Sequence, residues 1–262
     1  MSIELIVSLA SVTLALASGL ASAHTARRAR EFEVQLERQR KEEDAAAAAE
    51  RVRHQYRDPL LDAAQTLQSR IFNIVANGYL GTYLHCGDAD EERYARDYTI
   101  YAFAEYMCWV EIVRRELRFL DVGDLDHNRQ LLARLTQTQV TLQSDRLHGP
   151  FRIFRGRQRA IAELMMAPTA ASEGPRSECI GYAAFCRRLD EDVDFTDFAG
   201  WFVRLREDVE HAASRDRDDR LIRLQHDLID LIDHLDPKAL RIPPDYRHRL
   251  NQQSPIPVQA QP

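Results

Sequence analysis

The sequence predicts an all-α protein with a single N-terminal transmembrane helix, a charged helical stalk and a cytoplasmic bundle of six or seven helices. Three observations support this class. Residues 5–23 are uncharged, the next thirty are mostly charged residues and alanine, and the remainder carries apolar residues at helical spacing. The expected domains are an anchor, a stalk, a bundle and a disordered Pro/Gln tail at residues 1–24, 25–57, 58–236 and 237–262.

The anchor has the length of one membrane crossing. As a helix, residues 5–23 would span roughly 28 Å, close to the ~30 Å hydrocarbon core of a bilayer. Arg27, Arg28 and Arg30 follow at once, and no basic residue precedes the segment. Because Lys and Arg stay on the cytoplasmic side, we expect a single-pass protein of the cell membrane with most of its chain in the cytoplasm.

A cleaved signal peptide is the main alternative for the same residues. Ala21, Ser22 and Ala23 have the small side chains of a cleavage site. The segment before the apolar run lacks basic residues, however, and contains only Glu4 as a charge. The arginines just beyond the site would also oppose export, so the sequence favours an anchor that is not removed.

Small residues recur every four positions along one face of the anchor. Such a face lets a second helix approach closely, which makes a homodimer an option through Ser11, Ala15, Gly19 and Ala23. An Ala- and Ser-rich segment also produces this spacing by chance.

Composition limits the range of partners. The chain has 262 residues, 45% of them hydrophobic, and about 180 remain without anchor and tails, enough for one core. The net charge of −6 gives no general attraction to nucleic acid. The expected partners are the lipid bilayer and a protein, with no nucleic acid, and the excess of Arg over Lys favours a bacterial source.

No metal or cofactor is expected. The cysteines form no Cys-x-x-Cys pair and are interpreted as unpaired thiols of a reducing cytoplasm, Cys179 and Cys186 sharing a helix face. Asp124-x-x-His127 and Asp208-x-x-His211 come nearest to a di-iron motif, but both lie at expected helix ends. Nucleotide-binding and serine-hydrolase motifs are absent from the sequence.

The bundle is expected to begin at Asp58 and Pro59, a capping residue followed by a residue suited to the first helical position. Apolar spacing and Gly or Pro breaks predict helices over residues 58–87, 88–120, 124–142, 161–165, 179–189, 195–213 and 218–235. Residues 167–177 are expected to form a loop, and only the alternation at 151–154 suggests a strand. The helix at 98–110 is apolar on all sides and should lie in the core.

The helix at 218–235 carries a regular leucine stripe. In a chain with many amphipathic helices this favours internal packing over a zipper with another chain, and the leucines concerned are Leu221, Leu224, Leu228, Leu231 and Leu235.

Glu105 is the first candidate for chemistry, since it is the only charge in the apolar helix at 98–110. Burial would raise its pKa into a range suited to proton transfer. The simpler account pairs it with a buried arginine such as Arg70, or hydrogen-bonds it to a tyrosine or to an asparagine such as Asn73.

Four arginines near an expected helix start are the second candidate. Guanidinium groups match phosphate geometry, so the cluster predicts an anion or lipid-headgroup site at Arg152, Arg155, Arg157 and Arg159. Ordinary ion pairs with nearby carboxylates are the alternative.

The functional expectation is therefore a membrane-anchored interaction or scaffold module without catalytic residues. The alternative is a ligand sensor or enzyme that uses Glu105 and the four arginines on an anionic molecule.

Overall fold

The computed structural model describes residues 32–33, 35–41, 43–44, 47, 55–85, 87–116, 125–171, 174–192, 196–214 and 218–251. The chain divides into two compact units, residues 1–51 and 52–262. In the first unit the described residues are helical and exposed, and Glu37 and Lys41 form an ion pair of 2.8 Å one turn apart.

None of the described helices is long and apolar enough to cross a bilayer. The predicted crossing segment and the proposed dimer face, residues 5–23, lie outside the described residues. The membrane anchor, the alternative of signal-peptide cleavage and the homodimer therefore stay predictions.

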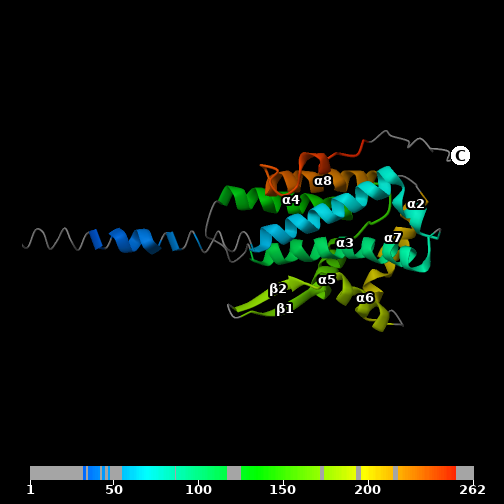
Figure 1. The fold of residues 1–262 in the computed structure, drawn as a ribbon, viewed down its shortest axis with the longest axis horizontal. Coiled ribbons are helices and arrows are strands. Elements are labelled where there is room, and N and C mark those ends of the chain that lie inside the picture. The colour runs from blue at the N-terminus through cyan, green and yellow to red at the C-terminus, as the bar shows by residue number, and fades with distance from the viewer. Residues whose placement is uncertain are drawn as a thin grey trace, which may run out of the picture. The chain divides into compact units, whose positions relative to one another are not determined.

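The second unit is a mostly helical bundle, as the sequence predicts (Figure 1). A helix at residues 55–77 precedes the other elements. These are α2 (Tyr79–Tyr83), α3 (Ala89–Glu116), α4 (Leu125–Gln143), α5 (Arg155–Met165), β1 (Met166–Ala171), β2 (Gly174–Cys179), α6 (Tyr182–Glu191), η1 (Ala199–Phe202), α7 (Val203–Ala213), α8 (Asp219–Leu235) and η2 (Pro244–Tyr246).

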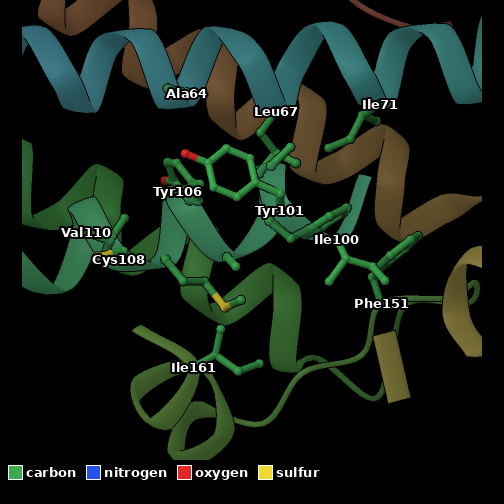
Figure 2. Packing of buried hydrophobic residues seen from close by; sticks show 14 of the residues in the cluster. Ala64, Leu67, Ile71, Ile100, Tyr101, Tyr106, Cys108, Val110, Phe151 and Ile161 are labelled. Atoms are coloured by element: carbon green, nitrogen blue, oxygen red, sulfur yellow. The ribbon is translucent and has the colours of Figure 1, made fainter. Parts of the chain in front are cut away.

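Helix α3 lies at the centre of the bundle, which confirms its predicted burial. Figure 1 shows α3 between the layer of α4, α8 and helix 55–77 and the layer of α5 and α6. Close up, Leu67 and Ile71 of helix 55–77 face Ile100 and Tyr106 of α3 (Figure 2). The leucine stripe of α8 is fully buried, so its role is internal packing.

The first bundle helix differs from the prediction at both ends. Residues 55–57 are already helical, so the chain does not break at Pro59. Arg57 donates hydrogen bonds to the carbonyl of Leu235 at the end of α8, which ties this stretch to the bundle. The helix stops at Gly78, whose φ of 63° lies in the left-handed region that favours glycine, and the short α2 then follows.

The expected loop at 167–177 is wrong, because β1 and β2 form an antiparallel hairpin there. Met166 pairs with Cys179, and Ala171 pairs with Gly174. Each strand of a two-stranded hairpin has a free edge, so prolines are tolerated in it. Cys179 therefore ends a strand instead of sharing a helix with Cys186 of α6.

The expected disorder from residue 237 onward is wrong for residues 237–251. Ile242 and Leu250 are buried in the core. The side-chain amide of Gln225 in α8 donates to the carbonyl of His248 at 2.7 Å and accepts from the Leu250 N–H at 3.1 Å. A side chain of α8 thus supplies hydrogen bonds that this irregular backbone does not make internally.

Candidate functional site

An open groove with a volume of about 420 Å³ lies beside helix 55–77, and we call it the tyrosine groove. Its lining residues are Gln65, Thr66, Ser69, Arg70, Asn73, Tyr79, Tyr94 and Tyr98. Five of them come from one helix and recur at spacings that keep them on one side of it. The three tyrosines come from α2 and the first half of α3.

The tyrosine wall is held in place by aromatic packing. Tyr94 and Tyr98, one turn apart on α3, stack with ring centroids 5.0 Å apart. Tyr182 of α6 packs edge-on against both rings, at 6.5 and 5.2 Å. The turn at Gly78 brings Tyr79 back over the same region. Burial raises the pKa of the Tyr98 phenol further above neutral pH.

Arg70 is the central residue of the groove. Its side chain is buried, with 7% of its surface exposed, and its guanidinium carbon lies 4.5, 4.8 and 5.3 Å from the ring centroids of Tyr79, Tyr98 and Tyr94. Its hydrogen bond is a long one, from Nη2 to the Tyr94 hydroxyl at 3.3 Å. No carboxylate of the described residues forms an ion pair with it. Among the described residues, the groups that balance the positive charge are thus aromatic rings.

A second hollow of about 240 Å³ adjoins the tyrosine groove. Ser69 and Asn73 line both hollows. The second one is also lined by Asp245, Tyr246 and His248 from the segment that follows α8. A ligand longer than the tyrosine groove could therefore extend into the second hollow along helix 55–77.

Glu105 lies outside the tyrosine groove and is hydrogen-bonded to a tyrosine, one of the partners that the simpler account allowed. It is half-buried and accepts a hydrogen bond of 3.0 Å from the Tyr101 hydroxyl. Burial raises the pKa of Glu105, while the hydrogen bond from Tyr101 acts in the opposite direction. Arg70 instead lies among tyrosine rings, and the side chain of Asn73 accepts a hydrogen bond from the side chain of Asn77.

In the predicted anion cluster, Arg152 and Arg155 each contact a neighbouring side chain. Arg152 lies over the ring of Phe154, with its guanidinium carbon 4.8 Å from the centroid. Arg155, at the start of α5, donates to the side chain of Gln139 at 3.0 Å.

Arg157 and Arg159 of the same cluster interact with two different parts of the bundle. Arg157 donates to the backbone carbonyl of Trp201 at 2.7 Å. Arg159 lies 3.7 Å from the carboxylate of Glu111 on α3. The four guanidinium groups thus have different partners, and anion binding by them stays a prediction.

A site that used Glu105 together with the four arginines would lie between α3 and residues 152–159, where the space is small. The cavity there has a volume of about 10 Å³, enough for one water molecule. Arg159 and Glu111 line it, whereas Glu105 does not. The described residues therefore offer no pocket that unites Glu105 with the arginines.

The described residues contain no cluster of His, Cys, Asp and Glu that could hold a metal ion. Asp208, from one of the two di-iron-like pairs, is buried and lies 3.7 Å from Arg204. Asp124 and Cys86 lie outside the described residues. The thiols of Cys108, Cys179 and Cys186 are free.

Sequence reasoning missed the tyrosine groove because its parts carry no motif. Arg70 entered only as a possible partner for Glu105, and Tyr98 only as the first residue of the apolar helix at 98–110. One signal was available: Gln65, Ser69 and Asn73 recur every four residues as a polar stripe beside the apolar face. A polar stripe usually faces solvent, so the stripe alone does not indicate a groove.

Comparison with protein-family models, curated proteins and solved structures finds no match to this chain. The fold and the groove together define a helical bundle in which the largely buried guanidinium of Arg70 lines an open groove.

Proposed function

We propose that this protein is a membrane-tethered, non-enzymatic interaction module whose helical bundle binds a partner at the tyrosine groove. One observation carries the proposal. The described chain buries the charge of Arg70 without supplying a carboxylate, and it does so in the lining of an open groove. A buried charge is normally paired, so the missing anion is expected from a ligand.

The lining of the groove supports binding over catalysis. Its eight residues include no carboxylate, histidine or cysteine, so they provide no general base at neutral pH. They do provide hydroxyl and amide groups that orient a ligand by hydrogen bonds. Membrane attachment rests on the uncharged segment at 5–23 and the arginines that follow it.

Site-specific photo-crosslinking in the native host tests the proposal. A photoreactive residue at Ser69 lies in the groove, and a matched one at the exposed Gln130 of α4 serves as control. We expect a discrete protein adduct from Ser69 that disappears in the Arg70→Gln background and does not form from Gln130. Absence of an adduct, or the same adducts from both positions, would contradict the proposal.

The same buried guanidinium also favours the second function, a sensor for an anionic small molecule. Mass spectrometry of the crosslinked chain separates the two. A protein-sized adduct supports the interaction module, whereas a mass increase of a few hundred daltons supports the sensor.

Topology is tested separately with reporters fused after Arg57. We expect an inactive alkaline phosphatase and a fluorescent green reporter, because both report a cytoplasmic position. An active phosphatase would overturn the cytoplasmic assignment and favour the cleaved signal peptide.

A further inference from the structure

The guanidinium of Arg70 has unused hydrogen-bond donors that face the tyrosine groove. An arginine carries five N–H donors, and here the Tyr94 hydroxyl accepts from Nη2. The Nε and Nη1 atoms have no hydrogen-bond partner, yet they are not among the completely buried unpartnered atoms of the described residues. They therefore retain solvent contact through the groove that Arg70 lines.

The surroundings of Arg70 favour an anion with one charge. The groove contains a single charged lining residue, and the other seven are neutral amides, hydroxyls and phenols. A phosphate dianion is usually held by several cations or by backbone N–H groups at a helix start. A carboxylate needs only one guanidinium, whose planar fork matches its two oxygens.

The walls of the groove favour a flat or apolar group next to that anion. The rings of Tyr94 and Tyr98 stand beside the guanidinium, packed from behind by Tyr182. Aromatic faces gain from contact with another ring. The volume of about 420 Å³ lies within the range of ligand pockets, and the adjoining hollow of about 240 Å³ accommodates an extension.

From these observations we infer that the tyrosine groove is a carboxylate-binding site, in which Arg70 pairs with the carboxylate of an aromatic or apolar ligand. The inference rests on the proposed function, since it names the chemical group that the interaction module recognises. A free carboxylic acid and the C-terminus of a peptide present the same group, and the experiment distinguishes them.

Calorimetric titration of the detergent-solubilised full-length protein provides the test. The probes are benzoate, its neutral isostere benzamide, phenyl phosphate, and a dipeptide ending in phenylalanine with a free or an amidated C-terminus. We expect saturable binding of benzoate with a Kd of about 1–10 mM. Benzamide and the amidated dipeptide should bind at least about tenfold more weakly, because they lack the charge that pairs with Arg70.

Matched variants locate the binding. Arg70→Gln should weaken benzoate binding by about tenfold or more, whereas Arg187→Gln, at an exposed arginine of α6, should leave it unchanged. Circular dichroism checks that each variant is folded. If Arg70→Gln does not fold, the comparison of benzoate with benzamide in the unaltered protein still decides the question.

Two sets of results support the inference and identify the source of the carboxylate. Tighter binding of the free dipeptide than of benzoate indicates a peptide C-terminus that reaches the adjoining hollow, and the reverse order indicates a small acid. Equal affinity for benzoate and benzamide, no saturable binding, or a preference for phenyl phosphate would each overturn it. If crosslinking from Ser69 persists in that case, the interaction module stands and only the ligand chemistry is wrong.

Discussion

Arg220 and Arg70 are both buried without an ion pair to a carboxylate of the described residues, and they are accommodated in opposite ways. Arg220, near the start of α8, has 1% of its surface exposed and donates to the carbonyls of Thr141, Ser144 and Leu147 at 3.1, 2.7 and 2.6 Å. Arg70 has one long hydrogen bond and three aromatic neighbours.

The difference lies in which groups accept hydrogen bonds from the guanidinium. Around Arg220 the chain itself uses the donors on Nη1 and Nη2, because the last turn of α4 and the following turn expose carbonyls that have no helical partner. Around Arg70 the tyrosine rings balance the charge but accept almost no hydrogen bonds. The two buried arginines thus differ in their contacts, since Arg220 joins α4 to α8 whereas Arg70 keeps donors that the described chain does not use.

The comparison predicts its largest effect for Arg220→Met. The substitution leaves several buried carbonyls without donors, each at about 1–3 kcal/mol, although it also removes a buried charge. We expect a net loss of about 3 kcal/mol, which lowers the Tm by roughly 6–12 °C. Thermal unfolding followed by circular dichroism measures it, with the exposed Arg187→Met as control. A loss no larger than the control's would show that the carbonyls have other donors.

Glu105→Gln extends the comparison to a half-buried anion without an ion-pair partner. Burial raises the pKa of Glu105 in the folded state. Stability is then highest below the unfolded pKa of about 4.3 and falls as the pH rises through the folded pKa. The glutamine variant should therefore be more stable at pH 7, on the order of 1 kcal/mol after allowance for partial exposure.

At pH 4 the advantage of Glu105→Gln should disappear, because the wild-type carboxyl group is then largely protonated as well. Melting curves at both pH values, with the exposed Glu178→Gln as control, check this sign. A variant that is less stable than wild type at pH 7 would mean that the ionised carboxylate is stabilised by groups other than Tyr101.

Arg70→Met should change stability far less than Arg220→Met. Loss of the cation–π contacts, about 0.5–2 kcal/mol, is offset by removal of a charge that is costly to bury. We expect a change of less than about 1 kcal/mol in the free energy of unfolding, together with loss of crosslinking from Ser69. A destabilisation as large as that of Arg220→Met would assign Arg70 a structural role and remove the basis of the proposed function.

Tyr94→Phe gives the smallest effect. The variant removes only the long hydrogen bond from Arg70 and keeps the ring stacked on Tyr98. Stability should change by less than about 0.5 kcal/mol, and benzoate affinity by about twofold at most. Calorimetry on this variant shows whether the ring or the hydroxyl of Tyr94 holds the guanidinium in place.

The fold was predictable wherever the evidence is local. Apolar spacing located the helices, and an apolar surface on all sides placed residues 98–110 of α3 at the centre. The hairpin was not predictable in this way, since Pro168 and Pro175 indicate a loop to any local criterion. The ordered stretch at 237–251 was missed for the same reason, because Gln225 and other distant residues hold it.

The candidate site was less predictable than the fold. The sequence identified Glu105 and the four arginines by their charge, but charge alone does not say which partners surround a side chain. Arg70 lies in a helix whose sequence shows only the usual apolar spacing. Its tyrosine neighbours come from residues 79 to 98, outside that helix.

By itself, therefore, the sequence determined the helical class, the segments that form helices and the side of each that is buried, because periodicity is a property of neighbouring residues. Only the tertiary structure decided that Arg220 meets backbone carbonyls while Arg70 meets aromatic rings. The physical reason is that the environment of a buried charge is assembled from segments far apart in the chain.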